Sequence, residues 1–201
     1  MSTKFSERNA VRLYRYPVAS ADIYHCEVNQ REIFICDDPV RGFRIWGEIP
    51  DLGSVSAVNL CQIFLEYAMY CQTWRDSLKA RQTMQSFAED LGIALANYFK
   101  NHPAAMLAAN IGVCALECIL ESMDAHFTVE QIGSELNFTV MGCPVLDTAR
   151  RSGLLEVELA HYGVNMLCQS LIRAIDPNLV IHAPENTLAK HIYSIGAPVY
   201  A

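Results

Sequence analysis

The pattern of apolar and polar positions changes its period along the chain, and each change predicts a different kind of element. Near the N-terminus, short apolar runs separated by polar residues favour strands. The predicted strands cover Ile23–Val28 and Glu32–Cys36, joined by a turn at Asn29–Arg31, and a third short strand covers Phe43–Trp46. We therefore expect the first fifty residues to form an extension that contains a β-hairpin.

After Pro50 the apolar residues recur at steps of three and four, which is the period of an α-helix. Either Ser54 or Ser56 is a suitable N-cap for this helix, because a hydroxyl can accept a hydrogen bond from the first free N–H groups. The helix is predicted to begin there and to end near Trp74.

Two further helices are predicted before the middle of the chain. The second begins at Asp76 or Ser77 and ends at Asn101, just ahead of a proline that disfavours helix in the preceding residue. The third covers Pro103–Met123 and is apolar on nearly every side, so it is expected to lie centrally in the molecule.

Beyond Asp124 the period switches to two, which is typical of strands. A hairpin with a turn at Gly133–Ser134, a long helix over 154–175 and two closing strands are predicted. The strands are Phe127–Ile132, Leu136–Val140, Leu179–His182 and His191–Ile195. Together the elements predict an α+β fold, in which helices pack on an antiparallel sheet and the C-terminal half forms a strand-pair, helix, strand-pair unit. Residues 1–50 would be the extension and residues 51–201 the ligand-binding part of a single domain.

Composition narrows the classes of function. Hydrophobic residues make up 52% of the chain and charged residues 18%, an apolar excess that indicates a dimer interface, an apolar pocket, or both. The net charge of -7, without a cluster of Lys and Arg, excludes a nucleic-acid partner, because a phosphate backbone requires a concentrated positive surface.

The chain shows no signal peptide and no stretch of eighteen uninterrupted apolar residues, so we expect a cytoplasmic protein without a transmembrane segment. The eight cysteines are scattered and form no CxxC pair, which predicts reduced thiols in the core. No group of His and Cys has the spacing of a zinc site, so no metal is predicted, and the sequence assigns no cofactor.

Three stretches carry a resemblance to a known family. They are the small-residue helix 87–95, the strand 136–144 that ends in a cysteine, and the closing hairpin 179–195. In this order they resemble the 4-vinyl-reductase domain, whose relatives include the transport-particle subunits and the aminothiazoline-carboxylate hydrolase-like proteins. The resemblance covers about residues 77–201. Relatives often carry Gly-Asp and a cysteine in the closing hairpin, whereas this chain has Ala189-Lys190-His191 and then Tyr193.

This resemblance implies a module that binds a small molecule or a lipid and is frequently dimeric. Because some relatives belong to photosynthetic pigment metabolism, a tetrapyrrole is among the ligands it suggests. It implies no defined catalytic activity.

Cys143 is the strongest candidate for a functional side chain, because it follows the end of a strand where a pocket is expected. A nucleophilic thiol needs a neighbouring histidine or cation to lower its pKa. His161, with Glu158 and Asn165 on the same predicted helix face, is the candidate base. The ordinary alternatives are a buried structural thiol and a solvated helix face.

Three hypotheses about function follow. The first is a binding module for a small hydrophobic ligand, such as a lipid, a tetrapyrrole or an aromatic compound, with a regulatory, delivery or assembly role. Its expected lining is Phe87, Leu91, Leu95, Phe138, Cys143, Tyr162 and Met166. The second is a hydrolase of a small heterocycle, with Cys143 as nucleophile and His161 as base. The third is a dimeric scaffold. Binding is favoured over catalysis, because the sequence assembles no complete catalytic constellation; a homodimer and a protein partner are expected.

Overall fold

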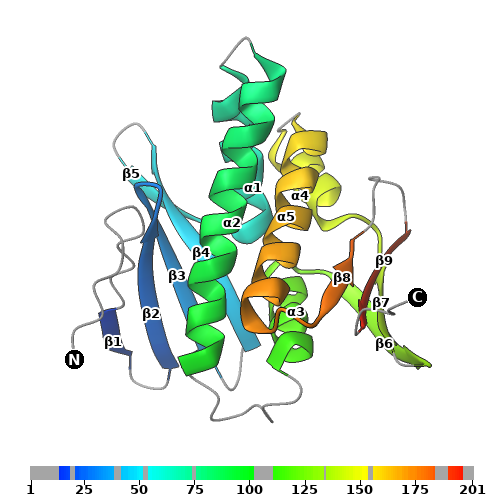
Figure 1. The fold of residues 1–201 in the computed structure, drawn as a ribbon. Coiled ribbons are helices and arrows are strands. Elements are labelled where there is room, and N and C mark those ends of the chain that lie inside the picture. Colours follow the sequence, from blue (N-terminus) through cyan, green and yellow to red (C-terminus); the bar gives the residue numbers. More distant parts are fainter. Residues whose placement is uncertain are drawn as a thin grey trace.

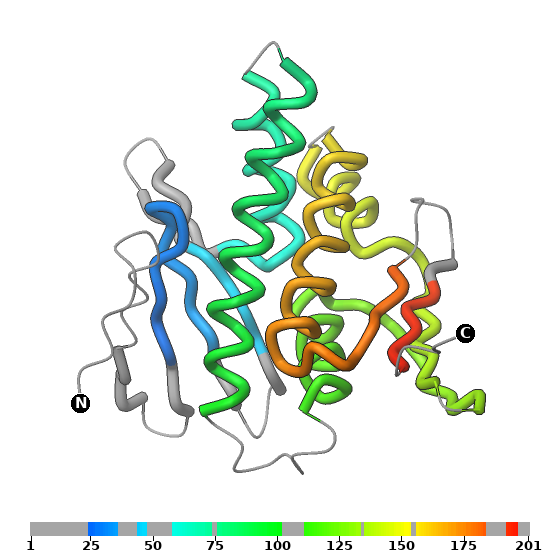
Figure 2. The backbone as a smooth tube through the Cα atoms, viewed as in Figure 1, coloured from blue at the N-terminus to red at the C-terminus, as the bar shows by residue number. Residues whose placement is uncertain are grey.

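The computed structural model describes residues 14–18, 21–38, 42–51, 54–73, 76–101, 111–133, 135–153, 156–183 and 190–196. These residues form two antiparallel sheets with helices between them (Figures 1 and 2). The predicted α+β class, with helices packed on antiparallel sheet, is confirmed.

The first sheet, here called the N-terminal sheet, is a five-stranded meander in which each strand pairs with the next along the chain. Its strands are β1 (Tyr14–Val18), β2 (Ala21–Val28), β3 (Arg31–Asp38), β4 (Gly42–Asp51) and β5 (Ser54–Asn59). The predicted hairpin and the strand after it are confirmed as β2, β3 and β4. Asn29 and Gln30 form the β2–β3 turn with φ of 49° and 63°, the left-handed pair of values that a two-residue hairpin turn requires.

The prediction that a helix begins at Ser54 or Ser56 is wrong. This segment is strand β5, in which Ser56 pairs with Ile49 of β4. Its serines alternate with Val55 and Ala57, which is the period of a strand. Helix α1 (Leu60–Gln72) begins after Asn59, whose Oδ1 accepts a hydrogen bond from the Gln62 N–H at 2.9 Å. Residue 50, where the extension was expected to end, lies within β4.

The remaining helices are α2 (Ser77–Asn101), α3 (Ile111–Ser122), α4 (Pro144–Ser152) and α5 (Val157–Ile175). The predicted start of α2 is confirmed, because Asp76 Oδ1 accepts hydrogen bonds from the backbone N–H groups of Leu78 and Lys79. The predicted start of the third helix, at Pro103, lies outside the described residues. Figure 1 shows α2 and α5 side by side at the centre of the molecule.

The second sheet, here called the C-terminal sheet, contains β6 (His126–Ile132), β7 (Glu135–Met141), β8 (Val180–His182) and β9 (Lys190–Gly196). Its order is β6-β7-β9-β8, so the last strand inserts between β7 and β8. The turn between β6 and β7 passes through Gly133 at φ 63°. Because α5 connects β7 to β8 by way of α4, the predicted strand-pair, helix, strand-pair unit is confirmed.

Both sheets share one hydrophobic cluster with the helices. Ile33 and Ile45 of the N-terminal sheet are almost fully buried, and Tyr24 of β2 meets Tyr98 of α2 edge to face with ring centroids 5.0 Å apart. Arg44 of β4 donates a 2.7 Å hydrogen bond to Asp124, in the turn that leads into β6. The N-terminal sheet is therefore part of the packed body of the molecule.

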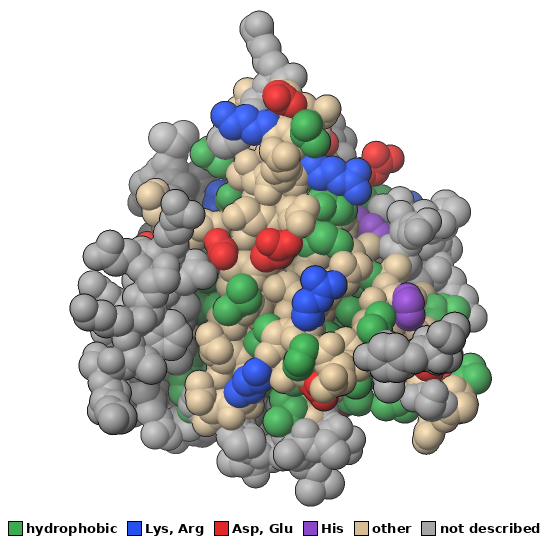
Figure 3. Space-filling model, viewed as in Figure 1, with side chains coloured by type: hydrophobic (Ala, Val, Ile, Leu, Met, Phe, Trp, Pro, Cys, Tyr) green, Lys and Arg blue, Asp and Glu red, His purple; other side chains and the backbone are tan. Residues whose placement is uncertain are grey.

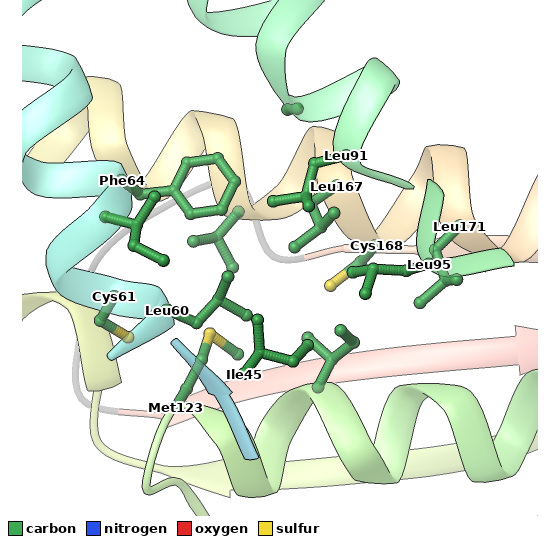
Figure 4. Packing of buried hydrophobic residues seen from close by; sticks show 14 of the residues in the cluster. Ile45, Leu60, Cys61, Phe64, Leu91, Leu95, Met123, Leu167, Cys168 and Leu171 are labelled. Carbon is green, nitrogen blue, oxygen red and sulfur yellow. The ribbon is translucent and has the colours of Figure 1, made fainter. Parts of the chain in front are cut away.

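Helices α2 and α5 approach closely because glycines lie at their contact. A Cβ atom on Gly92 would lie 2.8 Å from Ser170 Cβ and 2.9 Å from the Leu171 backbone nitrogen. A Cβ on Gly163 would lie 2.5 Å from Met84 Sδ and 2.7 Å from Phe64 Cδ1. Around these contacts the leucines of α2 and α5 interdigitate, as Figure 4 shows for Leu91, Leu95, Leu167 and Leu171.

We expect Gly92→Ala to lower the free energy of unfolding by roughly 1 to 3 kcal/mol, measured by urea denaturation. The added methyl group meets backbone, which cannot rotate away, so the clash exceeds the gain in helix propensity of about 1 kcal/mol. The exposed position Ser86 on the same helix provides the control, because Ser86→Ala adds no contact. A Gly92→Ala protein as stable as the wild type would show that the helices tolerate a wider separation.

Candidate functional site

A small cavity lies where α3, α4 and α5 meet the C-terminal sheet. Its volume is about 10 Å³, close to the space that one water molecule needs. The described residues that line it are Leu120, Met123, Val140, Cys143, Pro144, Val145, His161, Val164 and Tyr193. Most of this wall is apolar, while a thiol, an imidazole and a phenol also border the space. Among these lining residues none is Asp, Glu, Lys or Arg.

Cys143 reaches the cavity because the chain turns sharply where β7 ends. Gly142 adopts φ 83°, and Cys143 is then the N-cap of α4, with Pro144 in the first helical position. The Cys143 side chain is only 3% exposed. Burial raises the pKa of its thiol, whereas the backbone N–H groups of Leu146 and Val145 oppose this rise. The net direction is upward, so the thiol is protonated at neutral pH.

His161 lies on the side of α5 that is turned into the molecule, and it is 5% exposed. Asn165, one turn further along, is also buried, whereas Glu158 is exposed. The predicted face of Glu158, His161 and Asn165 is therefore divided between solvent and core. The structure brings His161 and Cys143, the two candidates for catalysis, to the same cavity.

Tyr193 is the residue that sequence reasoning missed. It projects from the central strand β9 and is 4% exposed, and its hydroxyl lies 3.3 Å from Asn165 Oδ1, to which it donates a hydrogen bond. Burial raises the pKa of this phenol well above its usual value, and the nearby thiols of Cys168, Cys143 and Cys61 act in the same direction. The signal in the sequence was the alternation in β9, which places Tyr193 and Ile195 on one face.

Two further thiols lie in the core near this cavity. Cys61 of α1 is fully buried beside the hydroxyl of Thr148, and Cys168 of α5 is fully buried. Burial raises the pKa of Cys168 to about 12 and also raises that of Cys61. The seven cysteines that the structure describes are reduced thiols, and five of them are buried.

Most of the other predicted lining residues lie elsewhere. Phe87, Leu91 and Leu95 of α2 are fully buried in the packed core, where Figure 4 shows Leu91 and Leu95. Phe87 stacks on Tyr67 with ring centroids 4.2 Å apart. Phe138 of β7 is opposite Tyr193 and shares its face of the sheet. Of the seven residues expected to line a pocket, Cys143 is the one that lines this cavity.

Tyr162 and Met166 are half-buried on α5. The Tyr162 hydroxyl donates a 2.9 Å hydrogen bond to Gln85 Oε1, and the Arg81 guanidinium lies 4.1 Å from the centre of its ring. Tyr162 thus contacts side chains of α2 near the surface. A role of Tyr162 and Met166 in ligand binding remains a prediction.

Three further properties concern the described part of the chain. It contains no group of three or more His, Cys, Asp or Glu side chains that could hold a metal ion. None of its helices combines the length and the apolar character needed to cross a membrane. On the face shown in Figure 3, the basic side chains are dispersed among acidic and hydrophobic ones.

The buried thiols predict a loss of stability at high pH. The pKa of Cys26 and of Cys168 is raised to about 12, whereas an ordinary thiol titrates at 9.0. Above pH 9 the unfolded chain therefore releases protons that the native state retains, so stability falls as pH rises. We expect a decrease of roughly 1 kcal/mol per pH unit for each such thiol between pH 9 and 11, measured by urea denaturation. Cys168→Ala should reduce this slope, and a flat profile would contradict the burial of the thiols.

Scans against protein-family models, curated proteins and solved structures each found no match to this chain. The resemblance to the 4-vinyl-reductase domain therefore remains a prediction, carried by the strand and helix order and by the cysteine that follows β7. Cys143, His161 and Tyr193, which border the cavity, are consequently the functional candidates that the structure provides.

Proposed function

We propose that this protein is a binding module for a small, mostly apolar molecule, which occupies an enlarged form of the cavity between α5 and the C-terminal sheet. The observation that carries this proposal is the composition of the cavity wall. Apolar side chains form most of it, and Cys143, His161 and Tyr193 converge on it from three different elements. Ligand sites in proteins commonly combine an apolar lining with a few convergent polar groups.

The chemistry of the wall indicates what the ligand would carry. The thiol of Cys143 is protonated at neutral pH, and the described lining includes no Lys or Arg that could neutralise a carboxylate or phosphate. Burying an anion without a cation is costly. The favoured ligand is therefore a neutral aromatic or lipid molecule, whose single polar end accepts or donates a hydrogen bond at the imidazole or the phenol.

The size of the cavity implies that binding requires opening. A space of about 10 Å³ holds roughly one water molecule, whereas pockets for drug-sized ligands enclose about 300–1,000 Å³. Pro144, at the start of α4, is half-buried, so it connects the cavity wall to the surface. Met123, after α3, is a flexible side chain that can adopt other rotamers. Displacement of these two residues is the simplest route for entry, and ligand binding then serves delivery, regulation or assembly.

A cysteine-dependent hydrolase is the second candidate, because Cys143 and His161 border the same cavity and the thiol lies at the start of a helix. A hydrolase of this kind needs Cys143 to be a thiolate at neutral pH. Burial acts in the opposite direction by raising the pKa of Cys143. Because the raised pKa of Cys143 disfavours the thiolate that a hydrolase needs, we favour the binding module over the hydrolase.

Ligand retention tests the proposal. We expect the native mass of the purified protein to exceed its denatured mass by that of a neutral ligand, or to increase after incubation with 1-naphthol or oleyl alcohol. Val164→Leu should abolish this gain, because the extra methylene fills a cavity of about 10 Å³. Val113→Leu, at a half-buried position of α3, is the matched control and should retain it. If neither native mass nor the two probes reveal binding, or if both variants bind equally, the proposal fails.

Thiol reactivity separates the two candidates. We expect iodoacetamide to modify Cys143 at pH 7.5 more slowly than it modifies a free thiol in a short peptide, because burial keeps this thiol protonated. Peptide mass spectrometry after timed quenching measures the rate at Cys143, and His161→Gln should leave it unchanged. Rapid alkylation that His161→Gln slows would instead support the hydrolase.

A further inference from the structure

Strand β6 is an exposed edge of the C-terminal sheet. It pairs with β7 on one side, and in the sheet order no described strand follows it on the other. Six of its seven side chains are exposed, among them Val129 at 38% and Ile132 at 60%. Figure 1 shows the strand at the lower right margin of the molecule. Among the described residues, no strand pairs with this edge, so it offers backbone N–H and C=O groups together with apolar side chains.

The sequence of β6 lacks the features that usually protect an edge strand. His126–Ile132 contains no Lys and no Pro, and Glu130 is its single acidic residue. Natural edge strands are commonly short, carry lysine or proline, or are covered by another segment. β8, at the opposite edge of this sheet, has only three residues. The seven-residue strand β6 is thus suited to pair with another strand.

The side chains of β6 complement those of a second copy in one antiparallel register. When two β6 strands meet about a two-fold axis at Thr128, His126 of each copy lies opposite Glu130 of the other. This pairs an imidazole with a carboxylate twice, and Phe127 lies opposite Val129 twice. Such cross-strand pairs stabilise antiparallel sheets.

The two faces of the strand are consistent with this register. Phe127 and Val129 lie opposite Val140 and Phe138 of β7, so they share the face that packs on the core. Pairing about Thr128 would therefore continue the hydrophobic face of one copy into that of the other. His126, Thr128 and Glu130 would form the opposite face of the joined sheet.

Neighbouring two-fold registers match less well. An axis at Val129 places His126 opposite Ile132 and Phe127 opposite Gln131. An axis at Glu130 places two carboxylates directly opposite each other, which is destabilising. Shifts by one residue would bring core-facing side chains opposite solvent-facing ones, because side chains alternate along a strand.

We propose that the protein forms a homodimer in which two β6 strands pair in antiparallel fashion about Thr128, so that two four-stranded sheets become one eight-stranded sheet. This inference does not rest on the proposed ligand, because the edge is exposed on the side of β6 away from β7. The occupant of the edge is a second copy of this chain.

Cross-linking tests the register in the full-length protein. Thr128→Cys places two thiols opposite each other on the axis, so mild oxidation should link most of the protein into a covalent dimer. Gln131→Cys, an exposed position of the same strand that lies off the axis, should give no more cross-linking than the wild type, whose native cysteines set the background. Preferential linking through Val129→Cys would overturn the register.

Charge reversal tests the pairing without oxidation. Sedimentation equilibrium of the wild type should give twice the mass of one chain. His126→Glu should weaken dimerisation by at least about 10-fold, because it places two carboxylates opposite each other at two sites. Adding Glu130→Lys should restore the dimer by making each pair attractive again.

An added charge on the axis gives an independent check. Thr128→Lys should shift the protein to monomer, whereas Gln82→Lys, which adds the same charge at an exposed position of α2, should not. Circular dichroism establishes that each variant is folded. A monomeric wild type at about 100 μM, where weak specific contacts are populated, or a dimer unaffected by these substitutions would overturn the inference.

Discussion

The close contact between α2 and α5 determines the positions of most other elements. Gly92 and Gly163 allow the two helix backbones to approach to a distance at which a Cβ atom would clash. On one side of this pair, α2 packs against the N-terminal sheet through contacts such as that of Tyr98 with Tyr24. On the other side, α5 presents His161 and Asn165 to the C-terminal sheet. If the two helices lay further apart, both sets of contacts would have to change, because α5 packs against α2 on one side and against the C-terminal sheet on the other.

Local signals predicted the elements well where a turn or a cap has a single physical solution. Asn29 tolerates left-handed backbone and Asp76 caps a helix, so the turn of the first hairpin and the start of α2 are predicted correctly, although Arg31, expected in the turn, is the first residue of β3. Ser54 and Ser56 fit both a helix cap and an exposed strand position, and here pairing with β4 decided in favour of a strand. The order β6-β7-β9-β8 depends on pairing between distant segments, which the period of a sequence does not encode.

Local signals in the sequence also identify part of the candidate site. Cys143 follows a strand, and His161 shares a predicted helix face with Glu158 and Asn165, so both signals are local. Tyr162 and Met166, which are expected to line the pocket, are instead half-buried on α5. The buried residues of α5 include Ala160, Gly163 and Val164, and at Gly163 the approach of Met84 of α2 leaves no room for a larger side chain. His161 and Asn165 are buried on α5 as well, and the Tyr193 hydroxyl meets Asn165 there.

The cavity and the exposed edge are close neighbours within the C-terminal sheet. Val140 of β7 lines the cavity, and Phe127 of the edge strand lies opposite Val140 on the same face. A ligand that enlarges the cavity has to displace part of this wall, whereas a second β6 strand would hold the same sheet in place from its edge. If the two proposed events both occur, each changes the free energy of the other by the same amount, since linkage between two binding equilibria is reciprocal. Pairing at the edge would then oppose opening through β7, which leaves the side of the cavity at Pro144 and Met123 as the part of the wall free to move.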